Sequence, residues 1–468
     1  MDSRNIIFIM LDTVRADMLR PYGGDVKVSN IERLSRDGVK YNMAIAPGTY
    51  TLPSHLSLFL GRRVADISWL KSTGMKFSDL MADPLLRKSR YSSNDLTIAQ
   101  VMEYFGYKSA LFSNNPFVSQ ATGLATGFSH VSNLFIDEKI NTNRPKVKAV
   151  LGLIQNDHTR RGLVNLAYRI ASVFSDRRVD SMYLSLRKRL NRHFSKEYGY
   201  YDLDKGASAT NLQLREYLKS KGSPRNFIFI NYMEGHEGYP TNLVTGNYVE
   251  QDKWLHMIGK ASTEDLLSTK EAYKRRITYL DAKVGQAIEI MKKSGTLDNA
   301  TVIISSDHGQ AFMEHGEMFH NVYPYNEVTR VPLVIANFRG GRQVRERKHI
   351  DEPFSLTDLN RIITGKPVDD ATKPVFSDHI GITEVWDTHL LRLFRKRSKN
   401  ADMVYRKKVE QDRHATAIYY KGYKLIHYYG GKSDELYSMS DDISESDNII
   451  GSRRSLARQM LALNKAPS

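Results

Sequence analysis

Short runs of consecutive apolar residues recur along the chain, at residues 6–11, 227–233, 301–307 and 331–336. Stretches with helical spacing of apolar residues separate them. Continuous apolar strands joined by helices are typical of a parallel sheet that is covered on both faces. The pattern therefore predicts an α/β fold.

Side chains that can bind a metal or transfer a proton follow three of these runs. Asp12 comes directly after the first run, His236 follows the second, and Asp307 ends the third. In open α/β sheets, functional groups gather where the strands end. We therefore expect these three side chains to lie near one another.

Two further regions differ in pattern. Residues 132–206 are rich in arginine with apolar residues at helical spacing, which predicts a helical insertion that packs on the domain; contact with an anionic surface is the alternative.

Glycine and charge at residues 337–353 predict a boundary between a catalytic domain (1–340) and a C-terminal subdomain (341–468). Alternating aromatic and polar residues at 417–439 predict a hairpin around a Gly-Gly turn.

Charge and composition narrow the class of protein. The 68 Lys and Arg residues exceed the 52 Asp and Glu residues, for a net charge of +16, so we expect the surface to attract anions. The basic clusters lack stacking aromatics, so nucleic acid is not an expected partner. The absence of cysteine excludes disulfides and a thiol nucleophile. The first apolar run is too short for a signal peptide or a membrane span, which predicts a cytoplasmic protein.

Thr51 has two interpretations. Pro53 and Gly61 suit the first turn and the end of a short helix, which places Thr51 at or just before the helix N-terminus. Its hydroxyl could cap that helix. It could instead act as a nucleophile, because a hydroxyl beside a bound cation and a helix N-terminus can attack an anionic ester.

A divalent cation is the cofactor that these residues suggest. Asp12, Thr51, Asp307 and His308 together offer two carboxylates, a hydroxyl and an imidazole. Such an oxygen-rich set favours Mn²⁺, Mg²⁺ or Ca²⁺ and is compatible with Zn²⁺. His236 is the expected acid that protonates the leaving oxygen.

The sequence resembles the sulfatase branch of the alkaline phosphatase superfamily over nearly its whole length. The segments that carry this resemblance occur in order at residues 6–23, 51–62, 231–239, 273–285, 305–335 and 420–448. The resemblance implies a mixed, mainly parallel sheet and a smaller C-terminal subdomain with a short antiparallel sheet and a helix.

The resemblance also implies roles for individual residues. Asp12, Asp307 and His308 match the family's metal ligands, Thr51 its nucleophile, and His236 and His320 residues that contact the reacting group. Arg15 is expected to lie near the anion or to hold Asp12. The predicted substrate-binding residues are Arg15, His55 and His315.

One departure from the family's pattern shapes the predicted function. Sulfatases carry Cys or Ser in a C/S-x-P-S-R motif and convert it to formylglycine, whereas this chain has Thr51 there and His55 in place of the arginine. Oxidation of threonine would give a ketone rather than an aldehyde. We therefore predict phosphoryl transfer from a phosphodiester or related ester through Thr51, on an anionic small molecule or glycan such as a phosphate-bearing sugar.

Two alternatives remain at this stage. One is a sulfatase that hydrolyses sulfate esters on a glycan without formylglycine. The other is a non-catalytic, sulfatase-like protein that binds acidic glycans or contacts an anionic membrane through its basic insertion. Retention of all the predicted metal ligands argues against the second.

Overall fold

The structure is a computed structural model. It describes residues 4–63, 96–120, 122–133, 203–219, 225–236, 262–320, 323–364, 373–379, 414–429 and 432–464. The predicted basic insertion at 132–206 therefore lies almost entirely outside the described residues.

A ten-stranded sheet forms the centre of the described chain. Its core strands are the predicted ones: β1 (Asn5–Leu11), β5 (Asn226–Tyr232), β6 (Asn299–Ser305) and β9 (Arg330–Arg339). The strand order is β11-β2-β9-β6-β1-β5-β3-β4, and β10 pairs with β9 while β12 pairs with β2. The remaining strands are β2 (Val39–Ile45), β3 (Lys108–Ser113), β4 (His130–Asn133), β10 (Arg342–Gln343), β11 (Lys348–Ile350) and β12 (Phe354–Ser355).

The sheet is mainly parallel, with one important exception. β1 pairs in parallel with both β5 and β6, and β3 pairs in parallel with β4 and β5. β9 runs antiparallel to β6 and β2, although its apolar run predicted a parallel strand. An apolar run reports burial on both faces but not strand direction. The mixed sheet expected from the family resemblance is confirmed.

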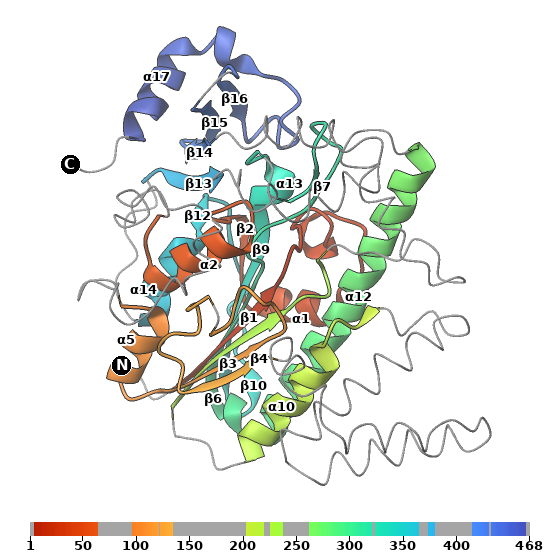
Figure 1. Cartoon of the computed structure of the whole chain (residues 1–468), viewed down its shortest axis with the longest axis vertical. Coiled ribbons are helices and arrows are strands. Elements are labelled where there is room, and N and C mark those ends of the chain that lie inside the picture. Colours follow the sequence, from red (N-terminus) through yellow and green to blue (C-terminus); the bar gives the residue numbers. More distant parts are fainter. Residues whose placement is uncertain are drawn as a thin grey trace, which may run out of the picture.

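Helices cover both faces of this sheet and create two cores. Alternate residues of β1 enter different cores: Ile7 and Ile9 face one, while Ile6 and Phe8 face the other. Figure 1 shows the two helical layers on opposite sides of the strands. The first layer holds α1 (Ser29–Asp37), α10 (Ala207–Lys219) and α12 (Thr263–Lys293), and the second holds α2 (Thr51–Leu60), α5 (Ile98–Tyr104) and α14 (Leu359–Thr364).

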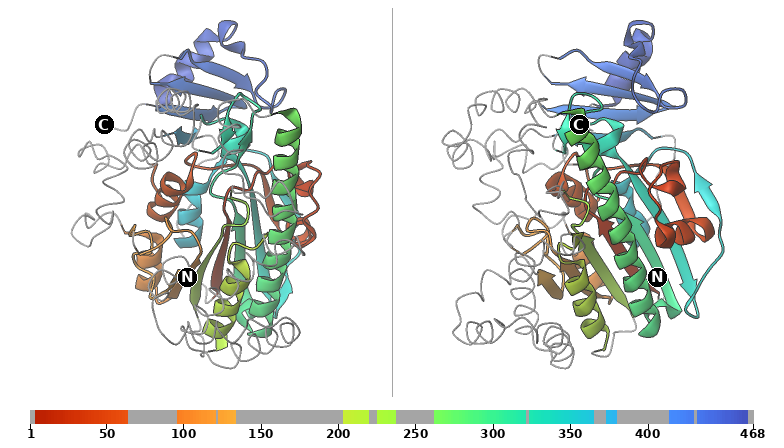
Figure 2. Two further views of the ribbon diagram at one scale, coloured as in Figure 1. Left: turned by 45° about the vertical axis from the view of Figure 1, so that its right-hand side comes forward. Right: turned by 90° about the vertical axis from the view of Figure 1, so that its right-hand side faces the viewer.

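A small antiparallel sheet forms the C-terminal part and lies at one end of the large sheet (Figure 2). Its strand order is β13-β14-β15-β16. This sheet begins later than the boundary predicted at residue 340, because β11 and β12 still pair with β2 of the large sheet. Its elements are β13 (Val375–His379), β14 (Ala415–Tyr420), β15 (Tyr423–Tyr428), β16 (Glu435–Ser438) and α17 (Arg454–Leu463).

The predicted C-terminal hairpin is two consecutive hairpins. β14 and β15 are joined by a tight turn at Lys421 and Gly422, whose φ angles are 48° and 79°. Positive φ at both turn residues matches the right-handed twist of the strands. The Gly-Gly pair lies in the next connection, between β15 and β16, outside the described residues.

Short elements complete the described chain. Two of them, β7 (Ala311–Phe312) and β8 (Met318–Phe319), pair as a small hairpin after β6. No helix in the described ranges is long and apolar enough to cross a membrane. The others are η1 (Arg20–Tyr22), η4 (Thr296–Asp298), α13 (Asn326–Thr329), η5 (Leu356–Asp358) and η6 (Ile449–Gly451).

Candidate active site

The ends of β1 and β6 bring two carboxylates and an imidazole together. Asp12 follows β1, and Asp307 and His308 follow β6, which pairs directly with β1. One candidate ligand atom from each residue lies within 4.8 Å of the others, and all three side chains are fully buried. The sequence prediction that these strand ends converge is met by the geometry.

The surroundings of Asp307 fit a bound cation. Its Oδ1 accepts backbone N–H bonds from Thr13 at 3.2 Å and from His308 at 3.0 Å. Its Oδ2 is buried and accepts no hydrogen bond from the described residues; it lies 3.6 Å from Nδ1 of His55 and 3.4 Å from Nε2 of His308. Burial raises the pKa of Asp307 to about 7, although both backbone N–H groups lower it. A nearby positive charge strongly stabilises the ionised form of a carboxylate that is buried in this way.

The tautomer of His308 supports the same conclusion. Its Nδ1 lies 3.0 Å from the carbonyl oxygen of Gly309, so Nδ1 carries a proton and donates it. In the neutral ring, Nε2 then presents a lone pair toward Asp307. Two electron-rich atoms 3.4 Å apart are compatible when a cation lies beside both.

The backbone after Asp12 is strained and tightly packed. Thr13 has a φ of 61°, which is costly for a β-branched residue. This conformation points its N–H at Asp307, and its hydroxyl donates to the carbonyl of Asp12 at 2.7 Å. Gly235 packs against the same carbonyl, so closely that a Cβ at this position would lie 2.4 Å from it. The strained conformation of Thr13 therefore helps to fix the positions of Asp12 and Asp307.

Thr51 is the first residue of α2, so it does not occupy the N-cap position. Tyr50 is the N-cap residue, and no side chain caps this end. The Thr51 hydroxyl instead lies 3.4 Å from Nε2 of His308. The side chain is 4% exposed. The hydroxyl therefore faces the carboxylate and imidazole cluster from the positive end of a helix.

His55 lies one turn further along α2 and is fully buried. Its Nδ1 donates to the carbonyl oxygen of Thr51 at 2.9 Å, and its Nε2 accepts from the side-chain amide of Asn231 at 3.3 Å. Burial lowers the pKa of His55 to about 4, which keeps the ring neutral. With both ring nitrogens bonded inside the protein, His55 supports Thr51 and Asp307, and its position does not favour the predicted contact with substrate.

Two more predicted histidines join the site. The ring of His320, which follows β8, lies between those of His308 and His236, with centroid separations of 4.6 and 4.8 Å. His320 also bonds through Nδ1 to the side-chain oxygen of Gln310 at 3.0 Å. His236 and His320 are partly exposed. These rings form the more open side of the cluster, where a substrate can approach.

Glu234 anchors the loop that carries His236. Its Oε1 accepts N–H bonds from Lys205 at 2.9 Å and Ala207 at 2.8 Å, where α10 begins. The ammonium of Lys205 in turn donates to the carbonyl of His236 at 2.6 Å. Burial raises the pKa of Glu234 to about 7. The sequence offers no local signal for this role, because the partners lie about 30 residues earlier.

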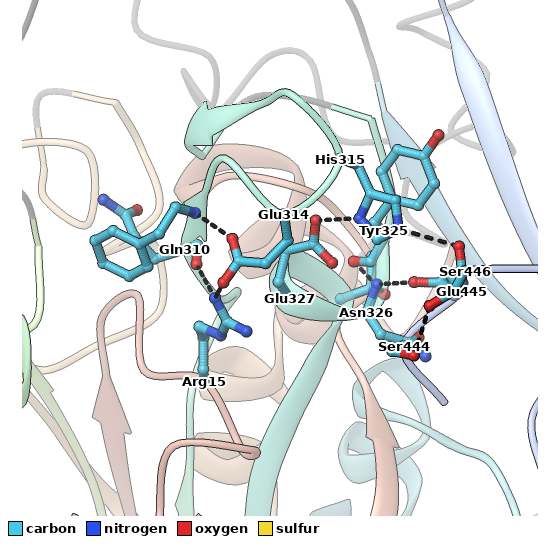
Figure 3. Close-up of polar contacts among 12 residues, drawn as sticks. Arg15, Gln310, Glu314, His315, Tyr325, Asn326, Glu327, Ser444, Glu445 and Ser446 are labelled. Atoms are coloured by element: carbon cyan, nitrogen blue, oxygen red, sulfur yellow. Dashed lines mark hydrogen bonds and ion pairs between the residues drawn. The ribbon is translucent and has the colours of Figure 1, made fainter. Parts of the chain in front are cut away.

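Arg15 is directed away from Asp12, contrary to one of the sequence expectations. Its guanidinium pairs with Asp17 at 2.7 Å and with Glu314 at 2.6 Å, and it donates to the carbonyl of Gln310 at 3.0 Å. Figure 3 shows the contacts with Glu314 and Gln310. Despite burial, the Arg15 charge lowers the pKa of Glu314 to about 2. Both partners are acidic, so Arg15 is already neutralised and its position does not favour the predicted role in substrate binding.

His315 lies at the junction with the C-terminal subdomain. Its Nδ1 contacts Glu327 at 2.7 Å and its Nε2 contacts the backbone oxygen of Glu445 at 3.2 Å (Figure 3). Tyr325 stacks on the ring with a centroid separation of 3.8 Å. These contacts make His315 a structural link between the two parts of the chain, and they do not favour the predicted substrate contact.

Asn115 is a site residue that the sequence analysis missed. It follows β3 and its side-chain amide donates to Oδ2 of Asp12 at 2.7 Å. The same nitrogen lies 3.5 Å from the hydroxyl of Thr51. The run before it contains lysine and serine, so it lacks the continuous apolar character that marked the other strand ends. The sequence did contain one signal for Asn115: the residues Asn-Asn-Pro, which are typical of a turn, directly follow β3.

Comparison with known proteins identifies the family. The sequence model of the Sulfatase family matches residues 4–361, which is most of the chain. The protein therefore belongs to the sulfatase family. Among curated proteins, the chain is 21% identical to an N-acetylglucosamine-6-O-sulfatase of Bacteroides thetaiotaomicron, over 96% of this chain and 82% of that protein.

Solved structures confirm the fold. A phosphonate monoester hydrolase of Agrobacterium radiobacter superimposes with a TM-score of 0.59 and 16% identity, over 98% of this chain and 95% of that one. A structure described as a 2-O GAG sulfatase gives a TM-score of 0.59 and 14% identity, over 98% of this chain and 91% of that one. At these identities the likeness concerns the fold.

Proposed function

We propose that this protein is a metal-dependent hydrolase of an anionic ester and that Thr51 is its nucleophile. One observation carries the proposal: the buried Thr51 hydroxyl lies 3.4 Å from Nε2 of His308, beside two carboxylates at the ends of adjacent strands. Membership of the sulfatase family supports hydrolysis of this kind of ester.

Asp12, Asp307 and His308 are the residues that would hold the metal, with Thr51 beside them. A bound divalent cation would favour loss of the Thr51 proton and would draw electron density from the ester group. The ligand types suit Mn²⁺, Mg²⁺ or Ca²⁺.

The remaining steps belong to the side chains. The Thr51 hydroxyl gives up its proton to solvent, its oxygen forms a bond to the sulfur or phosphorus atom, and the bond from that atom to the leaving oxygen breaks. His236 donates a proton to the leaving oxygen, and His320 contacts the anionic group. Water then attacks the sulfur or phosphorus atom and gives a proton to His236, and the bond to the Thr51 oxygen breaks, so that Thr51 is regenerated when its oxygen takes up a proton from solvent.

Sulfate esters of glycans are the substrate class that the relatives favour. The curated protein that aligns over nearly the whole chain is an N-acetylglucosamine-6-O-sulfatase, and several other relatives carry sulfatase names. The net charge of +16 is consistent with an anionic glycan as substrate.

Phosphodiesters are the second candidate, and Thr51 itself favours them. A threonine cannot supply the aldehyde hydrate of formylglycine, so release of the acid must occur by attack of water on a threonine ester. This sequence of steps is a common route for phosphoryl groups. A fold shared with phosphonate monoester hydrolases is compatible with this chemistry.

The test is a side-by-side assay of an aryl sulfate, an aryl phosphodiester and an aryl phosphomonoester, with and without Mn²⁺, Mg²⁺, Ca²⁺ or Zn²⁺. We expect turnover of a sulfate or a phosphodiester that requires the metal and falls at least about 1,000-fold in Thr51→Ala. The ester that is hydrolysed faster shows whether the enzyme is a sulfatase or a phosphodiesterase. Mass spectrometry of acid-quenched enzyme should find the adduct on Thr51.

Thr51→Ser is the matched control, because it retains the hydroxyl and should keep part of the activity. Equal turnover by Thr51→Ala and the wild type would reject the nucleophile. A wild-type protein that hydrolyses none of the esters but binds sulfated glycans, unchanged by Thr51→Ala, would instead indicate a binding protein.

A further inference from the structure

The orientation of the Asn115 side chain is fixed by two independent partners. Its Oδ1 accepts the backbone N–H of Phe117 at 2.8 Å, and its Nδ2 faces the carboxylate of Asp12 at 2.7 Å. A backbone N–H can only donate and a carboxylate can only accept, so the amide cannot be flipped. The NH₂ group therefore points into the site.

The backbone around Asn115 is also held firmly. Its N–H donates to the hydroxyl of Ser113 at 3.1 Å, and its carbonyl accepts from the side chain of Asn133 at 3.0 Å. The residue is 1% exposed. A buried residue with bonds at its N–H, its carbonyl and its side-chain oxygen presents its remaining donor in one direction only.

The direction of hydrogen bonding at Thr51 follows from this arrangement. The NH₂ group of Asn115 has two protons; one is used on Asp12, and the other faces the Thr51 oxygen at 3.5 Å. Because an amide NH₂ only donates, the Thr51 oxygen must be the acceptor in that contact. The Thr51 proton is therefore not directed at Asn115.

We propose that Asn115 is a positioning residue, whose side-chain amide holds a metal ligand, Asp12, and the nucleophile, Thr51, in one fixed relation. This inference rests on the proposed function and deepens it. Side chains that orient metal ligands in this way typically change metal affinity or activity by 10–100-fold when they are removed. Asn115 is neutral, so it can do this without competing with the metal or with an anionic substrate.

Two substitutions separate this role from mere support of the loop. Asn115→Ala removes both the donor and the acceptor. Asn115→Asp keeps the oxygen that accepts from Phe117, and therefore the loop, but replaces the donor with a second oxygen. Asn114→Ala is the matched control, because Asn114 is also buried but contacts Thr210 of α10 at 3.3 Å.

The readouts are the dissociation constant for Mn²⁺ by calorimetry, the melting temperature, and kcat and KM on whichever aryl ester the wild type hydrolyses. For Asn115→Ala we expect about 10–100-fold weaker Mn²⁺ binding and a comparable fall in kcat, with KM little changed. Asn115→Asp should lose kcat to a similar extent, and in chelator its melting temperature should fall, because the variant buries a second carboxylate beside that of Asp12. Asn114→Ala should change the melting temperature alone.

The outcomes separate this inference from the proposed function. If the wild type hydrolyses no ester but Asn115→Ala still weakens Mn²⁺ binding, the positioning role stands and the proposed reaction falls. Wild-type Mn²⁺ affinity in Asn115→Ala would overturn the inference. An active Asn115→Asp would do the same, as would equal losses in Asn114→Ala.

Discussion

Among the described residues, two largely buried clusters have the same composition, one histidine and two carboxylates, but differ in the source of positive charge. In the cluster of His315, Glu327 and Glu445, the chain supplies that charge itself. The buried ammonium of Lys424 lies 2.5 Å from Oε1 of Glu445. Glu327 raises the pKa of His315 despite partial burial, which favours the charged form of this ring.

The cluster of Asp12, Asp307 and His308 is different. The described residues give Asp307 only histidines as ion-pair partners, and burial lowers the pKa of one of them, His55, to about 4. A buried carboxylate needs a compensating charge, from the chain or from solution. The comparison supports the proposal that the second cluster holds a cation from solution, whereas the contacts of the first make it a structural junction.

The largest expected effect is at Asp307. Asp307→Asn should abolish metal-dependent turnover and the rise in melting temperature caused by Mn²⁺, which at 100 times the dissociation constant corresponds to about 2.7 kcal/mol in the wild type. In chelator above pH 7, the same variant should be more stable than the wild type, because it removes a buried charge. Calorimetry with and without Mn²⁺ checks both effects.

The matched change in the other cluster is Glu327→Gln, which should leave the Mn²⁺ shift intact. Loss of the shift in both variants would remove the distinction between the clusters.

The next largest effect is at Lys424. Lys424→Met leaves Glu445 as an uncompensated buried charge and should destabilise the fold by about 3–5 kcal/mol, as measured by urea unfolding. Adding Glu445→Gln should restore part of the loss, because the orphaned charge disappears. If the single variant costs less than about 1 kcal/mol, the internal charge balance proposed for this cluster is wrong.

A smaller, pH-dependent effect is expected at His315. The pKa of His315 is raised in the folded state, so its ion pair with Glu327 contributes fully below about pH 6.5, the ordinary histidine value, and is lost as pH rises through the raised pKa. His315→Gln should therefore cost about 1–3 kcal/mol at pH 5.5 and much less at pH 9. Unfolding experiments at both values test this; an equal loss at both would assign the effect to packing on Tyr325.

The smallest effect is expected at Glu314. Glu314→Gln leaves Arg15 paired with Asp17, so we expect a loss of about 0.5–1 kcal/mol and nearly unchanged kcat and KM. The pKa of Glu314 is lowered to about 2, so its contribution is present above its ordinary value near 4.5 and disappears between that value and pH 2. A large rise in the KM of Glu314→Gln would instead indicate that Arg15 contributes to substrate binding.

The sequence predicted the residues that lie at strand ends, because an apolar run followed by Asp is a local signal. Asp12 and Asp307 were found in this way, and their convergence follows from the pairing of β1 with β6. The direction of β9 could not be predicted, because apolar character is the same in either direction. Spacing likewise placed the start of α2 near Thr51 but not the direction of its hydroxyl.

Choices of partner were harder to predict than positions. Arg15 lies three residues from Asp12, yet it pairs with Asp17 and with Glu314, about 300 residues away. His315 is near His320 in the sequence but bonds to Glu327 and to the backbone of Glu445. These outcomes depend on which chain segments meet in three dimensions, which local patterns do not encode.

The position of β1 has a consequence for how the chain acquires its fold. This strand precedes both of its neighbours, β5 and β6, by more than 200 residues, and Asn5 pairs with Ala300. At about 5–20 residues per second, roughly 15–60 s pass between synthesis of the two partners. During that interval the apolar strand has at least one open edge, because β6 is made after β5, and it must avoid other chains. We therefore expect slow folding that depends on chaperones, and an active site that forms only in the last stage of assembly.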